Sequence, residues 1–106
     1  MGENSNCLPD EHVERSMREL AAAFIELGEH AERIDVYFEL ADADNYRMAL
    51  KSGNGKSVTE FDPLVLYHAQ VWLAYLQRTN PNMRRIQMSM TAAGGEYQVS
   101  IQEWHG

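Results

Sequence analysis

The chain has 106 residues, of which 44% are hydrophobic and 24% are charged, and its formal net charge is −7. This length fits one domain, and the balance of apolar and charged residues is that of a folded globular protein. The single cysteine, Cys7, excludes an internal disulfide framework and a multi-thiolate metal site. No apolar run approaches the roughly 18 residues of a membrane helix, and the N-terminus lacks a secretion signal, so we expect a soluble cytoplasmic protein.

The acidic residues are concentrated in the first part of the chain. Residues 1–44 contain twelve acids and three bases, a net charge of −9, whereas residues 45–106 carry +2. Nucleic-acid binding requires a basic stripe that displaces counterions from phosphates, so we expect no nucleic-acid partner. An acidic surface instead attracts a basic protein and speeds the encounter at low salt. The alternative interpretation is that the acidity only keeps a small protein soluble.

A tail and an amphipathic helix are predicted at the start of the chain. Residues 1–8 are typical of a flexible tail, and Pro9 suits the first turn of a helix. Apolar residues then recur at three- and four-residue spacing, which indicates a helix over residues 10–27. These residues are Val13, Met17, Leu20, Ala21, Phe24 and Leu27. Gly28 is the residue expected to end the helix.

Two stretches of alternating apolar and polar residues predict a β-hairpin after this helix. The first stretch runs from Ile34 to Leu40 and the second from Tyr46 to Leu50, with turn-forming residues 42–44 between them. One register pairs apolar residues with each other and opposite charges with each other, and a one-residue slip destroys both matches. It sets Leu40 opposite Tyr46, Phe38 opposite Met48, Val36 opposite Leu50, Glu39 opposite Arg47, and Asp35 opposite Lys51.

A second helix and a second hairpin complete the chain. After a loop and a short extended piece at residues 52–61, Asp62 is a good N-cap for a helix over residues 63–79. Because apolar residues wrap most of the circumference of this helix, we expect it to be central and buried. The second hairpin turns at Gly94-Gly95, which suits a type I′ turn. Its register sets Ala92 opposite Tyr97, Met90 opposite Val99, Met88 opposite Ile101, Ser89 opposite Ser100, Gln87 opposite Gln102, and Arg85 opposite Trp104.

The predicted element order is therefore α-β-β-α-β-β, in a single domain over residues 9–106. Two hairpins that each have one apolar and one polar face predict an α+β fold of two layers. We expect a four-stranded antiparallel sheet with both helices on its apolar face.

The motifs that would carry catalysis, a phosphate or a metal are incomplete. The run from Gly53 to Ser57 lacks the upstream glycine and the following helix of a phosphate-binding loop. Residues 42–45 contain two aspartates, but Arg47 and Gly53 replace the glycine and the distal acidic ligand of a calcium loop. The four histidines are not spaced as metal ligands, and His68 is expected to be a satisfied histidine of the second helix. We therefore expect no enzymatic activity, no cofactor and no metal site.

Three segments carry a resemblance to a known family. They are the first helix Met17-Arg18-Glu19-Leu20-Ala21-Ala22-Ala23-Phe24, the hairpin around Ile34–Leu50, and the C-terminal Arg85-Ile86-Gln87-Met88-Ser89-Met90 with Gly95-Glu96-Tyr97-Gln98-Val99-Ser100-Ile101. Their pattern, over most of residues 10–104, resembles that of the YezG-like immunity proteins. Such proteins are small and cytoplasmic, belong to bacterial toxin–immunity pairs, and protect the producing cell by binding its toxin. The resemblance implies a binding protein, and the family has no catalytic motif to transfer.

We therefore expect a small acidic immunity protein that neutralises a cognate basic, nuclease-type toxin by direct binding. The acids expected to contact the toxin, after the first helix and at the first hairpin turn, are Glu26, Glu29, Glu32, Asp42 and Asp44. The second hairpin also sends Trp104 outward beside Arg85, which is either an interface pair or a surface cation–π pair without a partner. The alternative function is a non-enzymatic adaptor or secretion-chaperone-like subunit, which acts as a homodimer through the second helix or Trp104.

Overall fold

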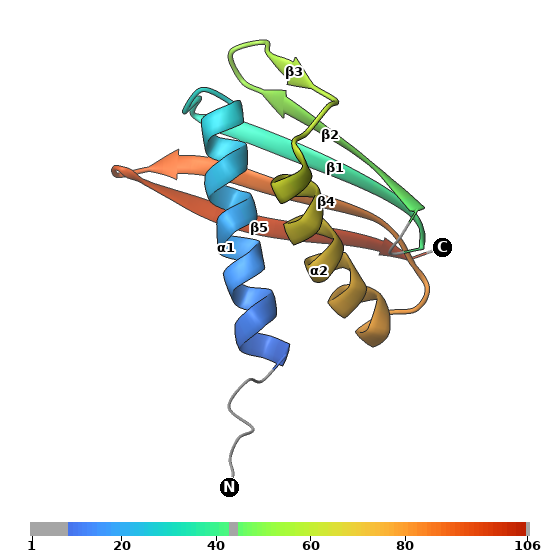
Figure 1. Cartoon of the computed structure of the whole chain (residues 1–106). Helices are drawn as coiled ribbons and strands as arrows, with labels where there is room; N and C mark the ends of the chain where they lie inside the picture. Colours follow the sequence, from blue (N-terminus) through green and yellow to red (C-terminus); the bar gives the residue numbers. More distant parts are fainter. Residues whose placement is uncertain (1–8, 43–44, 106) are drawn as a thin grey trace, which may run out of the picture.

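The computed structural model describes residues 9–42 and 45–105, and the protein has an α+β fold (Figure 1). The elements are α1 (Pro9–Leu27), β1 (Arg33–Asp42), β2 (Asn45–Ser52), β3 (Ser57–Val58), α2 (Pro63–Thr79), β4 (Met83–Ala93) and β5 (Glu96–His105). Both helices lie within one residue of their predicted bounds. The tail predicted for residues 1–8 lies outside the described residues.

The sheet has five antiparallel strands in the order β3-β2-β1-β4-β5, so the prediction of four strands is wrong by one. The additional strand, β3, pairs only with Leu50 and Lys51 of β2. The loop that precedes β3 is closed by a 2.8 Å hydrogen bond from the Ser52 amide to the Lys56 carbonyl. This bond returns the chain alongside β2, and a strand of two residues is too short to produce an alternating pattern.

The registers predicted for both hairpins are confirmed at every pair. In the first hairpin, Glu39 lies opposite Arg47 and Val36 opposite Leu50. The second hairpin turns at Gly94 and Gly95, whose φ angles of 61° and 87° are those that a two-residue turn of type I′ requires. Burial and turn geometry therefore select the same alignment.

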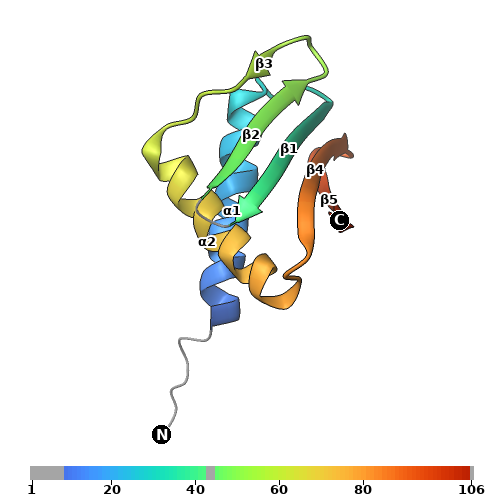
Figure 2. The same ribbon diagram turned by 90° about the vertical axis from the view of Figure 1, so that its right-hand side faces the viewer.

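Both helices lie on one side of the sheet, in front of it in Figure 1 and to its left in Figure 2. On that side the side chains of β1, β2 and β4 form the core, and these are buried: Ile34, Val36, Phe38, Leu40, Met48, Leu50, Ile86, Met88 and Met90. Alternate side chains of these strands and of β5 point to the opposite side, which no described element covers. We call this opposite side the bare face; the residues of it discussed below are Arg33, Asp35, Tyr37, Glu39, Arg47, Lys51, Arg85, Gln87, Ser89, Glu96 and Trp104.

Three aromatic rings join the two helices to the central strand. The ring of Phe38 in β1 lies 6.4 Å from that of Phe24 in α1 and 5.5 Å from that of Trp72 in α2, both edge to face. All three side chains are at most 2% exposed. Such pairs add about 0.5–1.5 kcal/mol each beyond the burial of apolar area, so β1 is the strand on which both helices depend.

Helix α2 is not the central helix that its composition predicts. Asp62 caps it as expected, since its carboxylate accepts 3.0 Å hydrogen bonds from two amides of the first turn. Only Val65, Ala69, Trp72 and Leu73 of the helix are buried. Leu64, Leu66 and Tyr67 are 65%, 39% and 51% exposed. Because the fold has only one layer of helices on one sheet, only one face of α2 is covered. The apolar residues on its other face are exposed to solvent. Neither described helix combines the length and the hydropathy needed to cross a membrane.

The end of α1 also differs from the predicted glycine stop. The left-handed residues are Glu29 and His30, with φ angles of 58° and 57°. Gly28 serves a different purpose, because a Cβ there would lie 2.7 Å from the Cδ1 atom of the fully buried Ile34. The glycine therefore permits the close approach of α1 to β1 at the turn that joins them.

Replacing Trp72 with alanine tests whether α2 contributes to the core. We expect Trp72→Ala to lower the free energy of unfolding by about 3–5 kcal/mol, because it empties a site that is 2% exposed. Urea denaturation followed by far-ultraviolet circular dichroism measures the change. A loss below about 1 kcal/mol would contradict the packing described here.

Candidate protein-binding site

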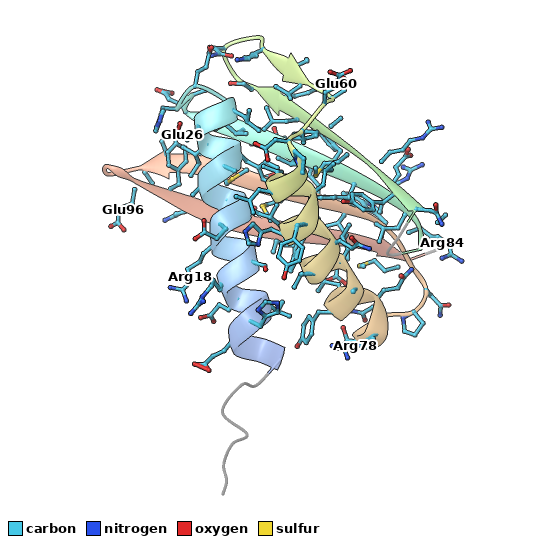
Figure 3. All side chains as sticks on the ribbon, in the orientation of Figure 1. Arg18, Glu26, Glu60, Arg78, Arg84 and Glu96 are labelled. Atoms are coloured by element: carbon cyan, nitrogen blue, oxygen red, sulfur yellow. The ribbon has the colours of Figure 1, made fainter. Side chains whose placement is uncertain are left out.

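Three of the predicted contact acids lie around the turn between α1 and β1. Glu26 is 4.0 Å from the His30 imidazole, and its side chain is 78% exposed. The Glu29 carboxylate lies 3.2 Å from the Lys56 ammonium and accepts a 3.0 Å hydrogen bond from the Asn54 amide. Glu32 is exposed at the entry to β1. Figure 3 shows Glu26 projecting from the upper end of α1. These acids form an exposed group that tethers the β2–β3 loop through Glu29.

Another of the predicted acids, Asp42, is at the opposite end of β1. Asp42 is the last residue of that strand and pairs with Asn45 after a bulge, while its side chain and Asp44 lie outside the described residues. Nine steps of about 3.3 Å separate Arg33 from Asp42 along the strand, a span of roughly 30 Å. The structure therefore brings Glu26, Glu29 and Glu32 together at one end of β1, away from the backbone of Asp42 at the other.

Arg85 and Trp104 are neighbours across β4 and β5 on the bare face, as predicted. Trp104 is 44% exposed. The Arg85 guanidinium is directed to Glu39 of β1, with 3.8 Å between Nε and Oε2. A hollow of about 1180 Å³ opens at this part of the sheet, and its lining includes Tyr37, Glu39, Arg47, Arg85, Gln87 and Trp104.

The hollow continues around the edge of β2 toward the start of α2. Tyr46, Phe61 and Leu66 line it there. The Tyr46 hydroxyl donates a 3.2 Å hydrogen bond to the Leu66 carbonyl, which fixes the strand edge to the helix. Burial raises the pKa of this phenol, so Tyr46 remains a neutral hydrogen-bond donor at physiological pH.

The bare face is basic, which the distribution of charge along the chain did not predict. Its charged residues on β1, β2 and β4 are the bases Arg33, Arg47, Lys51 and Arg85 and the acids Asp35 and Glu39. These three strands contribute +2 to the face, and Glu96 in β5 lowers the sum to +1, in a chain of −7. Part of the signal was present in the sequence, since Arg47, Lys51 and Arg85 occupy outward positions of the predicted hairpins and Arg33 directly precedes the first predicted strand. Arg47 forms no ion pair with any residue that the structure describes, so its charge is available to a partner.

Asp35 organises the centre of the bare face. Its carboxylate accepts hydrogen bonds from Arg33 at 3.1 Å, Gln87 at 3.2 Å and Ser89 at 2.6 Å. Burial by itself would raise the pKa of this carboxyl, but the three donors outweigh it and hold the pKa below its usual range. The network joins β1 to β4, and the middle of the face is therefore a rigid surface.

The only close serine–histidine contact among the described residues joins the two helices. The Ser16 hydroxyl lies 3.1 Å from Nδ1 of His68, which is half-buried. Ser16 is 1% exposed, so a substrate cannot reach its hydroxyl. The pair ties α1 to α2, and His68 is satisfied as the sequence predicts. Within residues 9–42 and 45–105, no three acids, histidines or cysteines lie close enough to hold a metal.

Comparison with known proteins adds no family assignment. No protein-family model, no curated protein and no solved structure matches this chain. The functional argument therefore depends on the surfaces themselves: exposed acids around α1, a basic bare face with two exposed aromatic side chains, and exposed apolar residues on α2.

The acid sensitivity of the fold tests the Asp35 network. Because the pKa of Asp35 is lower in the folded chain, its contribution to stability is complete above about pH 4 and is lost as the pH falls through the folded value. We expect Asp35→Asn to be less stable than the wild type at pH 7, and the difference to narrow at pH 3. Urea denaturation at the two pH values measures it.

The matched control is Glu19→Gln, which removes one carboxylate from the exposed surface of α1. It should leave the stability difference between pH 7 and pH 3 close to that of the wild type. A difference between Asp35→Asn and the wild type that stays constant over this range would contradict a charged role for Asp35.

Proposed function

We propose that this protein is a small protein-binding module and acts as an immunity protein, which neutralises a cognate basic toxin of nuclease type by direct binding. The supporting observation is the exposed acidic group Glu26, Glu29 and Glu32 beside α1, which also carries exposed Glu11, Glu14 and Glu19. A nuclease presents a basic surface to phosphates, and an acidic protein that covers this surface blocks access of the substrate.

The geometry of the acids determines how they act. The side chains of Glu26 and Glu29 are 78% and 57% exposed, so both carboxylates are well solvated and burying them in an interface would cost free energy. Rim charges steer the approach of a partner and change the association rate, whereas desolvated charges change the dissociation rate. We therefore assign these acids to steering the toxin, and we place the contact that holds it elsewhere on the protein.

The first test is biological. The chain is co-expressed with the product of the adjacent open reading frame, and growth of the host is measured with and without it. Rescue of growth together with co-purification of the two proteins is expected. A toxic neighbour that is neither bound nor neutralised would refute the immunity role.

The second test separates the contributions of the predicted acids by kinetics. The triple variant Glu26→Gln, Glu29→Gln and Glu32→Gln should slow association with the toxin by roughly tenfold at low salt and leave dissociation nearly unchanged. Surface plasmon resonance over a range of ionic strengths measures both rates. The double variant Asp42→Asn and Asp44→Asn shows in the same assay what the other two predicted acids contribute to the association rate.

A matched control has the same loss of charge on the other part of α1: Glu11→Gln, Glu14→Gln and Glu19→Gln. It separates a local contact region from the total charge of the chain. Equal association rates for the wild type and the variant at Glu26, Glu29 and Glu32 would rule out steering by these acids.

The exposed apolar residues of α2 favour a second candidate, a non-enzymatic adaptor or secretion-chaperone-like subunit that acts as a homodimer. Leu64 and Tyr67 are more than half exposed, and Leu66 lies beside them. Adjacent exposed apolar side chains are typical of an interaction surface.

The oligomeric state tests this second candidate. We expect the adaptor to be a dimer by light scattering, and Leu64→Lys to convert it to a monomer because a buried, unpaired ammonium is costly. The variant Glu60→Lys adds a lysine just before α2 and serves as the control. A wild-type chain that stays monomeric at high concentration would refute the adaptor.

A further inference from the structure

Strand β5 is an edge of the sheet with unpaired main-chain groups. Its first residue, Glu96, pairs with Ala93 across the two-residue turn, so these two residues exchange hydrogen bonds. Main-chain direction alternates along a strand, and the N–H and C=O groups of Tyr97, Val99 and Ile101 therefore point away from β4. Beyond β5 the structure describes no further strand, so these groups have no partner in the described sheet.

The side chains of the same residues are incompletely covered by the helices. Val99 is 40% exposed and Ile101 is 37% exposed, although both lie on the helix side of the sheet. Their cross-strand neighbours in β4, Met90 and Met88, are completely buried. The helices therefore cover the apolar side chains of β4 completely but those of β5 only in part. As a result, a strip of exposed apolar surface runs beside the unpaired edge.

The opposite edge of the sheet lacks these properties. There β3 has only two residues and pairs with Leu50 and Lys51, while the part of β2 not paired with β3 carries Arg47 and is joined to α2 by the hydrogen bond from Tyr46 to Leu66. Short edge strands and lysines are two of the devices by which proteins prevent pairing with another chain. In β5, residues 98–102 carry no charge, no proline and no register shift. An edge of this kind is a template for an additional strand.

The position of the helices identifies what fits this edge. In Figures 1 and 2 the N-terminal part of α1 and the C-terminal part of α2 continue below β5, past the edge of the sheet. Pairing β5 with β5 of a second copy places the helices of that copy on the same side of the joined sheet. Both pairs of helices would then compete for one space. A single extended segment has no helices, and it fits beside β5 beneath the projecting ends.

Charge defines the chemistry of that segment. The strand β5 begins with Glu96, and it contains no lysine or arginine. We propose that β5 is a strand-addition site for an extended segment of a basic protein partner. The segment has apolar residues at alternate positions, which pack beneath the helices on Val99 and Ile101, and lysine or arginine at the end that lies beside Glu96. The inference rests on the proposed role as a protein-binding module, and it adds the contact that holds the partner.

The added strand supplies a specific contact of ordinary size. The outward groups of Tyr97, Val99 and Ile101 offer three donors and three acceptors, and thus about six main-chain hydrogen bonds. A typical protein–protein interface contains about ten direct hydrogen bonds of all kinds, with a spread of about five. Covering Val99 and Ile101 adds apolar burial to these bonds, and the steering acids beside α1 remain outside the contact.

The test uses a defined peptide and does not require the natural partner. The probe is a fluorescent peptide of about eight residues that alternates valine with threonine between terminal lysines. Binding is followed by fluorescence anisotropy, and hydrogen exchange by NMR follows the individual amides. We expect saturable binding and slower exchange of the amides of Tyr97, Val99 and Ile101, while those of Gln98 and Ser100 are already protected by β4.

Two pairs of matched variants make the result specific. Val99→Lys should weaken peptide binding at least roughly tenfold, whereas Leu66→Lys, at a site with nearly equal exposure on α2, should leave it unchanged. Peptides with N-methyl groups on the edge facing β5 should not bind, whereas those methylated on the other edge should bind. Circular dichroism establishes that both protein variants are folded.

The outcomes separate this inference from the immunity role. The triple variant at Glu26, Glu29 and Glu32 should bind the peptide as the wild type does, even where its association with a toxin is slower. Absence of saturable binding, equal losses in Val99→Lys and Leu66→Lys, or protection of the Val99 amide by self-association without peptide would each overturn strand addition at β5. Failure of growth rescue with normal peptide binding would overturn only the immunity role.

Discussion

The alternation of side chains along β1 is the constraint on which the rest of this structure depends. Because β1 lies between β2 and β4, its residues are in register with both of these strands. Its buried side chains also pack against both helices. Phe38 contacts Phe24 and Trp72 on the core side, while its neighbour Glu39 lies between Arg47 and Arg85 on the bare face. A slip of one residue in β1 would exchange the two faces, because the period of a strand is two. The core and the basic surface are therefore products of one alignment.

The sequence was sufficient to predict the parts of the fold in which two signals agree. Both hairpin registers satisfied burial and cross-strand charge or turn geometry together, and α2 had both a capping residue, Asp62, and a proline at its first position. Features that depend on three-dimensional neighbours were not predictable. A two-residue strand such as β3 has no periodicity, and the composition of α2 does not reveal how many layers cover it. Gly28 was expected at the helix end for its backbone freedom, but it is needed for its contact with Ile34.

The candidate site could be predicted only in part, for the same reason. The acids around α1 were recognisable because they are close in sequence, and Arg85 and Trp104 because the hairpin register makes them neighbours. The basic bare face brings together residues from strands far apart in the chain, such as Arg47 and Arg85. The net charge of this face is opposite in sign to that of residues 1–44, so counting charges along the sequence did not reveal it. Trp104 and Tyr37 add exposed aromatic surface to this face.

In the proposed function, one group of residues steers the partner toward the protein and another holds it in the complex, which gives each of the different surfaces of this small domain a separate role. Exposed acids such as Glu26 act through a long-range field, which is weakened by salt and needs no close fit. An unpaired strand edge acts only at contact, through main-chain hydrogen bonds that are independent of side-chain identity. The apolar side chains of Val99 and Ile101 then determine which segments fit. A partner recognised by both the acids beside α1 and the edge of β5 would need a basic surface and an extended segment together. This double requirement gives higher specificity than either surface alone.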